Sequence, residues 1–324
     1  MTKLTRRNLI RRATGFGIVG LAAYAAPRRS LADSLQPSSS LEPRGDRFGS
    51  GVYNTEQVAD ELRYLEANIR PSGETHGKRI LITGSAAGLG QLAAAHLLHR
   101  GHRIVAHARN EQRAAEVQRD LPDLDAVVIG NLLNVEETRS LAEQINALGT
   151  FDVIIHNSGE YGLPDAEILQ ANSLSPYLLT VLVDTPREAM VYLTSDLHLS
   201  GDLKLEELRN GGANINYNDS KLHMATLATA LARRRPNLRV NAVAPGWVPT
   251  IMGFHNGPYA PDDLRAGYMT QVQLSERTDS ISQVTGKFLF HQKEETRVHP
   301  NVYDERAQDA LLAAFAKRSG VSLG

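Results

Sequence analysis

Three polar side chains in the second half of the chain could together transfer a proton, namely Ser195, Tyr217 and Lys221. Tyr217 and Lys221 are four residues apart at the start of a helical run, so both lie on one helix face. A free tyrosine has a pKa of about 10, and a nearby ammonium lowers that pKa because it favours the phenolate. Tyr217 could then act as general acid in reduction and general base in oxidation. Ser195, at the end of a predicted strand, could stabilise charge on the substrate oxygen.

A glycine-rich turn in the first half could bind a phosphate group. The run Thr83-Gly84-Ser85-Ala86-Ala87-Gly88-Leu89-Gly90 follows a short apolar segment and precedes the Ala- and Leu-rich stretch QLAAAHLLHR. A tight turn from strand to helix lets the backbone approach a pyrophosphate, which the free N–H groups and positive dipole end of the helix attract. A turn without any ligand is the alternative. Its placement between a predicted strand and a predicted helix favours a dinucleotide site.

These two motifs resemble those of the short-chain dehydrogenase/reductase superfamily: TGxxxGxG at 83–90, and YxxxK at 217–221 after a strand that ends in serine. The resemblance extends over about residues 78–290, and the end of the chain is similar to retinol-dehydrogenase-like reductases. It implies a single-domain Rossmann fold, NAD or NADP as cofactor, and hydride transfer between nicotinamide C4 and a carbonyl carbon. It also implies a small-molecule carbonyl or alcohol substrate and, often, a homo-oligomer.

The resemblance assigns roles to further residues. Asn172 matches the asparagine that holds a proton-relay water near the lysine, although the stretch from Asn172 to Ser195 is short for the family and a purely structural role is the alternative. The run from Pro245 to Thr250 resembles PGxVxT, a loop that approaches the nicotinamide carboxamide. The residues implied to contact the cofactor are Thr83, Gly84, Ser85, Gly88, Leu89, Gly90, Arg109, Asn131, Leu132, Asn157, Ser158, Gly159, Tyr217, Lys221, Pro245, Gly246, Val248 and Thr250.

The end of the second predicted strand indicates which cofactor is used. An acid about 20 residues after the glycines would bind the ribose hydroxyls of NAD, but the chain has Arg109 there. A guanidinium suits a 2′-phosphate through paired, charge-assisted hydrogen bonds, which favours NADP over NAD. Two departures from the family pattern follow: Asn131 replaces an aspartate, and 156–159 reads HNSG in place of NNAG.

The pattern of apolar runs predicts an α/β fold, with a doubly wound parallel sheet and helices on both faces. Strands are expected at 79–84, 102–109, 126–129, 151–156, 190–194 and 287–290, and helices at 111–120, 135–147 and about 304–318. The family's substrate loop would span about 251–284. Its apolar residues could line a substrate pocket or serve only in packing; they are Met252, Phe254, Tyr259, Tyr268 and Met269.

The start of the chain has the features of an export signal. Arg6-Arg7 resembles the twin-arginine signal, a modest apolar stretch follows from Ala13 to Ala26, and Ser30-Leu31-Ala32 fits a cleavage site. A disordered basic tail is the alternative. The sequence therefore predicts a signal peptide at 1–32, recognised by the twin-arginine export machinery, and an exported, periplasmic protein. Residues 33–77 would form a linker and an amphipathic helix at about 55–69, ahead of the dehydrogenase domain at 78–324.

Composition excludes several other classes of protein. There are no cysteines, so disulfides and thiolate metal sites are impossible, and the scattered histidines predict no metal site. Residues 1–32 hold seven bases and no acid, which leaves 28 bases against 36 acids and argues against a nucleic-acid partner. Two alternatives to a carbonyl reductase remain: a non-catalytic NADP-binding sensor or partner protein, and a sugar-nucleotide epimerase.

Overall fold

The computed structural model describes residues 47–48, 53–71, 77–211 and 214–323. The predicted signal peptide at 1–32 lies outside these residues. In the described part of the chain, one eight-stranded sheet has the order β3-β2-β1-β4-β5-β6-β7-β8. Its strands are β1 (Arg79–Ile82), β2 (Arg103–Ala108), β3 (Ala126–Ile129), β4 (Val153–His156), β5 (Ala189–Leu193), β6 (Arg239–Ala244), β7 (Phe288–Phe290) and β8 (Lys293–Glu294).

The sheet is parallel from β3 through β7, which confirms the predicted α/β architecture. Strand β8, which pairs antiparallel with β7, was not predicted. Only two residues long and charged, it carries no apolar alternation that could have revealed it.

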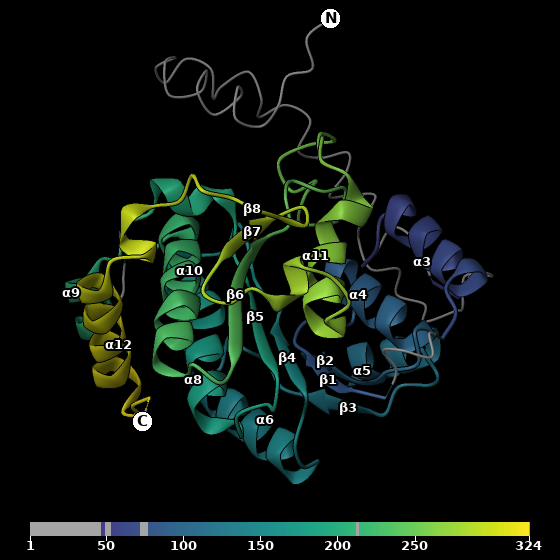
Figure 1. The fold of residues 1–324 in the computed structure, drawn as a ribbon, viewed down its shortest axis with the longest axis horizontal. Coiled ribbons are helices and arrows are strands. Elements are labelled where there is room, and N and C mark those ends of the chain that lie inside the picture. The colour runs from purple at the N-terminus through teal and green to yellow at the C-terminus, as the bar shows by residue number, and fades with distance from the viewer. Residues whose placement is uncertain (1–46, 49–52, 72–76, 212–213, 324) are drawn as a thin grey trace, which may run out of the picture.

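Helices cover both faces of the sheet (Figure 1). The helices of the described residues are α3 (Glu56–Asn68), α4 (Gly88–His99), α5 (Glu111–Asp120), α6 (Val135–Ala147), α7 (Asp165–Leu169), α8 (Ser175–Leu182), α9 (Leu205–Asn210), α10 (Tyr217–Arg234), α11 (Leu264–Glu276) and α12 (Glu305–Ser319). One apolar core packs α3, α4, α5 and α11 against the sheet, and the other packs α6, α8, α10 and α12 against the opposite face. Among the described residues, no helix is long and apolar enough to span a bilayer.

Helix α10 begins at a defined residue because its first turn is capped from both sides. The Asn216 side chain accepts hydrogen bonds from the N–H groups of Asn218 and Asp219, while the Asp219 carboxylate accepts one from the Asn216 N–H. Such a reciprocal cap satisfies backbone donors that would otherwise lack partners. Tyr217 therefore occupies the first helical position, and Lys221 lies one turn further on.

Helix α11 lies inside the segment 251–284, which was predicted as a loop. Asp263 caps its first turn by accepting from the Ala266 N–H, and Tyr268 and Val272 are buried against the sheet. A capping residue followed by apolar residues four apart could have indicated this helix. Tyr268 is fully buried and donates to Glu61 over 2.6 Å, so of the two readings left open for this residue the structure favours packing.

Candidate active site

Every residue proposed for catalysis or cofactor binding lies at or near one edge of the sheet, because the carboxyl ends of parallel strands meet there. The glycine turn follows β1, Arg109 follows β2 and Asn131 follows the end of β3. Asn157 then follows β4, and Pro245 follows β6. Ser195 comes two residues after β5, and α10 carries Tyr217 and Lys221 to the same edge.

Lys221 is buried directly behind the tyrosine. Its side chain is 5% exposed, its Nζ lies 5.3 Å from the centroid of the Tyr217 ring, and it donates to the carbonyl oxygen of Leu193 over 3.4 Å. Burial lowers the pKa of Lys221 to about 8 because it disfavours the charged form. The ammonium form of Lys221 would favour the phenolate of Tyr217.

Ser195 is also buried, and its hydroxyl is held at the start of a 3-10 turn, Asp196–Ser200. The Oγ atom accepts from the Leu197 N–H and donates to a carboxylate oxygen of Asp196, both over 3.2 Å. His198 donates from Nδ1 to the Ser195 carbonyl oxygen over 2.7 Å, and its Nε2 accepts from a backbone N–H. The backbone of Ser195 is thereby fixed from the buried side.

Asn172 lies beside Lys221, in a π-helical turn at Gln170–Leu174. Its side chain accepts from the Glu160 N–H over 2.7 Å and donates to the Glu160 carbonyl over 2.9 Å. A Cβ atom at Gly159 would lie 3.1 Å from Lys221 Nζ and 3.6 Å from Asn172 Oδ1. Gly159 therefore lines a space that a larger residue would fill, between the asparagine and the lysine.

The glycine turn is packed tightly against the segment after β4. Gly84 has a φ of +65°, and a Cβ atom there would lie 2.6 Å from Ser158 Oγ. A Cβ atom at Gly90 would lie 2.4 Å from the Gly84 carbonyl oxygen, so only glycine lets α4 start this close to the turn. Thr83 Oγ1 accepts from the N–H groups of Asn157 and Ser158 over 3.0 and 3.1 Å.

A buried histidine, His107, holds the glycine turn by a hydrogen bond to its backbone. His107 Nδ1 accepts from the Gly84 N–H over 3.0 Å, and its Nε2 donates to the Gly130 carbonyl over 2.8 Å. Burial lowers the pKa of His107, in agreement with a neutral ring that both donates and accepts. Ser85 is fully buried, and its hydroxyl binds the Ile82 carbonyl and the His107 N–H. His107 could not be predicted from the sequence, because nothing in a buried strand distinguishes a supporting histidine from a core histidine.

The remaining proposed cofactor residues lie around this turn. Arg109 is exposed at the end of β2. Asn131 forms a tight turn in which its Oδ1 accepts from the Leu133 N–H, and Leu132 is buried. The 245–250 loop approaches the glycine turn from the other side: a Cβ atom at Gly88 would lie 3.8 Å from the Thr250 methyl group. Thr250 Oγ1 is held by the Gly253 N–H.

Tyr161 and His255, which were not predicted as site residues, form an aromatic wall beside Tyr217, the proposed catalytic tyrosine. The Tyr161 ring meets the Tyr217 ring edge-on at 4.8 Å, and the His255 ring meets Tyr161 edge-on at 5.2 Å. Asn256 Nδ2 donates to the Tyr161 hydroxyl over 2.9 Å. The loop after Thr250 therefore contacts Tyr161 through His255 and Asn256, and Tyr161 in turn contacts Tyr217. The predicted lining residue Met252 is 41% exposed.

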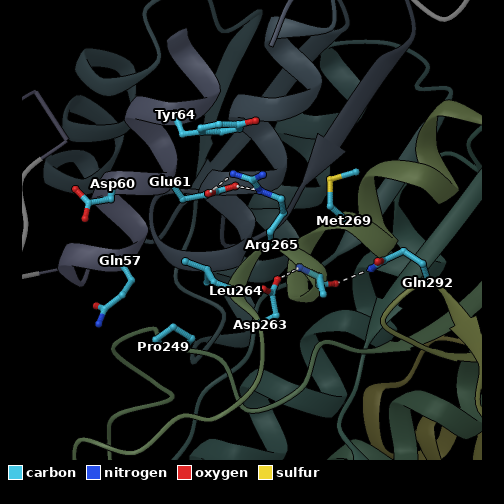
Figure 2. A pocket seen from close by; sticks show the side chains of 11 residues that line it. Gln57, Asp60, Glu61, Tyr64, Pro249, Asp263, Leu264, Arg265, Met269 and Gln292 are labelled. Atoms are coloured by element: carbon cyan, nitrogen blue, oxygen red, sulfur yellow. Dashed lines mark hydrogen bonds and ion pairs between the residues drawn. The ribbon is translucent and has the colours of Figure 1, made fainter. Parts of the chain in front are cut away.

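A separate open groove of about 770 Å³ lies between α3 and α11 (Figure 2). Glu61 of α3 accepts hydrogen bonds from Nε and Nη2 of the Arg265 guanidinium, at 2.7 and 2.8 Å. Its lining includes Pro249 but none of Ser195, Tyr217 and Lys221. The groove is therefore distinct from the proposed catalytic centre. Among the described residues, no cluster of three or more histidine or acidic side chains is placed to hold a metal ion.

Comparison with known proteins gives consistent relatives. The short chain dehydrogenase family model matches residues 78–180. An uncharacterized oxidoreductase of Emericella nidulans is 36% identical over 256 residues, which cover 76% of this chain and 98% of the relative. The short-chain dehydrogenase chry4 of Gibberella zeae is 36% identical over 261 residues, with the same shares covered. Human retinol dehydrogenase 14 is 31% identical over 220 residues, covering 56% of this chain and 65% of its own length.

Solved structures share the fold at lower identity. A protein from Mycobacterium paratuberculosis superimposes with a TM-score of 0.65 at 21% identity, over 80% of this chain and 98% of the other. A short chain dehydrogenase from Shigella flexneri, solved with NADP, gives 0.52 at 22% identity, over 68% of this chain and all of the other. These structures agree with the parallel sheet and its flanking helices.

Proposed function

Because the chain belongs to the short-chain dehydrogenase family of oxidoreductases, we propose that it interconverts a carbonyl compound and an alcohol with NADP(H), and that Tyr217 is its general acid and base. One observation carries this proposal. Tyr217 occupies the first position of α10, and the buried Lys221 lies directly behind its ring, at the same sheet edge as Ser195.

The residues at this edge fit a dinucleotide. The glycine turn brings the backbone at the start of α4 to the sheet edge, and Gly159 leaves free the space beside Lys221 and Asn172. When bound, the nicotinamide cofactor supplies the hydride in reduction or accepts it in oxidation. In reduction Tyr217 donates its hydroxyl proton to the carbonyl oxygen, while the Ser195 hydroxyl exchanges its bond to Asp196 for a hydrogen bond to that oxygen. Lys221 favours the phenolate that remains. The remaining lone pair of Asn172 Oδ1 would hold a water that returns the proton, which is the relay role that the family resemblance implies.

The preference for NADP rests on Arg109. Its side chain is exposed immediately after β2, and no acid lies in the stretch 107–110 where a ribose-binding carboxylate would be expected. The Shigella flexneri relative was solved with NADP, which supports the same cofactor class for this chain.

The direct test is NADPH oxidation with a panel of ketones and aldehydes. We expect turnover with at least one compound, measured as loss of absorbance at the nicotinamide band, and weaker activity with NADH. Tight NADPH binding without turnover of any carbonyl or alcohol would contradict catalysis and favour a non-catalytic binding protein. Turnover of a sugar nucleotide without net oxidation of the cofactor would instead indicate an epimerase.

We further propose that the chain is exported through the twin-arginine route and acts in the periplasm. Arg6-Arg7, a weak apolar stretch and a small-residue cleavage site occur in the required order. This route carries folded proteins, so an enzyme whose cofactor is made inside the cell can bind it before export. The absence of cysteines also suits an oxidising compartment.

Cell fractionation tests the export proposal. The native chain should be found outside the cytoplasmic membrane as a mature form beginning near Asp33. The double variant Arg6→Lys/Arg7→Lys should stay in the cytoplasm at full length, because lysine keeps the charge but lacks the guanidinium fork. If the native chain is also cytoplasmic and uncleaved, the protein is not exported.

A further inference from the structure

We propose that Tyr53, Asn54 and Thr55, which precede the first strand of the sheet, form a brace that holds the cofactor-binding loops in their binding geometry. This inference rests on the proposed binding of a nicotinamide dinucleotide at the glycine turn. It adds to that site three positioning residues that lie outside the motifs of the sequence.

Asn54 holds the first residue of α4. Its Oδ1 accepts from the Gly88 N–H over 2.9 Å, and its Nδ2 donates to Gln91 Oε1 over 2.8 Å, one turn further along the same helix. Asn54 is 2% exposed, and Gln91 is itself fixed by Asp120 at 3.0 Å. The first N–H groups of a helix have no partner within the helix. By binding the Gly88 N–H, Asn54 fixes the start of α4 while the next N–H groups stay available for a phosphate.

Tyr53 holds the other side of the same turn through an arginine. The Arg113 guanidinium lies 3.5 Å from the centroid of the Tyr53 ring, and it donates a hydrogen bond to the Ala86 carbonyl. Arg113 is 6% exposed, and burial lowers its pKa to about 10. The Tyr53 ring therefore covers a guanidinium cation that has little access to water. Asn54 therefore holds Gly88 directly, and its neighbour Tyr53 acts on Ala86 through Arg113.

Thr55 connects this turn to the second cofactor loop. Its hydroxyl donates to the Pro249 carbonyl over 2.7 Å and also accepts from the Val58 N–H at the start of α3. Pro249 lies next to Thr250, whose methyl group faces Gly88. The brace thus sets the distance between the loops on the two sides of the proposed cofactor site. A loop held in this way before binding does not have to be ordered at the expense of affinity.

The test measures NADPH and NADH binding by nicotinamide fluorescence with the full-length chain. Asn54→Ala should raise the dissociation constants of both cofactors together by about 2- to 10-fold, because of its two hydrogen bonds the one that holds the glycine turn, from the Gly88 N–H, is lost. Tyr53→Leu should raise both by about 2- to 5-fold, whereas Tyr53→Phe, which keeps the ring over Arg113, should bind as the native chain does.

The matched control is Glu61→Gln, which weakens the contact of α3 with Arg265 but leaves residues 53–55 unchanged. If the brace only stabilises the fold, Asn54→Ala and Glu61→Gln will lower the melting temperature and leave both dissociation constants unchanged, which overturns the inference. Equal binding by Tyr53→Leu and Tyr53→Phe would also overturn it, and this pair is decisive if Asn54→Ala does not fold. If the native chain binds neither cofactor, the proposed function fails and the inference fails with it.

Discussion

Replacing Tyr217 by Phe is expected to lower kcat at least about 100-fold and to leave NADPH binding nearly unchanged. The phenyl ring preserves the packing against Tyr161 and Lys221, so only the hydroxyl that exchanges the proton is lost. General acid–base groups contribute about 100- to 10,000-fold to rate, which sets the lower bound of the expected loss. Steady-state turnover and NADPH fluorescence titration, measured on the same preparation, separate the loss of chemistry from a loss of binding.

Tyr161→Phe is the matched control, because it removes the hydroxyl of the tyrosine that packs edge-on against Tyr217. That hydroxyl accepts a hydrogen bond from Asn256, so its loss should alter the wall beside the substrate and not the proton transfer. Near-normal turnover by folded Tyr217→Phe protein would falsify the proposed mechanism. A large loss of turnover in Tyr161→Phe, with near-normal turnover in Tyr217→Phe, would indicate that Tyr161 is the proton donor.

The second large effect is expected at Arg109. Arg109→Ala should weaken NADPH binding by about 10- to 150-fold and NADH binding far less, because hydrogen bonds to charged groups contribute about 1.5–3 kcal/mol. Only NADPH carries the 2′-phosphate that the guanidinium would bind. Titration of both cofactors against native and variant chains gives the ratio directly.

Arg103→Ala controls for the loss of a positive charge from the same strand. Arg103 begins β2, at the end opposite Arg109, and its side chain is 59% exposed and paired with Asp125. Its removal should leave the ratio of the two dissociation constants unchanged. A native preference for NADH, or an equal effect of Arg109→Ala on both cofactors, shows that the arginine does not select the cofactor.

Six of the eight described strands and most helices could be predicted because each carries a strong local pattern, whereas β6 and β8 were not predicted. The apolar runs of β1 and β4 are buried on both faces of the sheet, and the caps of α5 and α10 lie in the sequence next to the helices they start. The glycine turn, Ser195 and the Tyr217–Lys221 pair were also recognisable, since their spacing along the chain is itself required by their geometry.

The supporting residues could not be predicted, because their partners are remote in the sequence. His107 contacts Gly84 across 23 residues, and Asn54 contacts Gly88 across 34. Tyr161 meets Asn256 across 95 residues. No periodicity or motif records such pairs. Each is set by how β2, the N-terminal segment and the 251–262 segment pack, and that packing emerges only when the whole sheet is formed.

The contacts of Thr55 and Glu61 also set the order in which the molecule can be completed. Thr55 binds Pro249 across 194 residues, and Glu61 binds Arg265 across 204. A ribosome makes α3 early, yet its partners leave the ribosome only after β6 has been synthesised. Contacts between residues this far apart in the sequence form late, because other contacts must first offset the entropy lost in closing such a long loop. Helix α3 also packs on α4, which is made soon after it, so the helix can dock early while its contacts with Pro249 and Arg265 form late. Until the Thr55–Pro249 contact forms, the proposed cofactor site of a nascent chain is still unfinished.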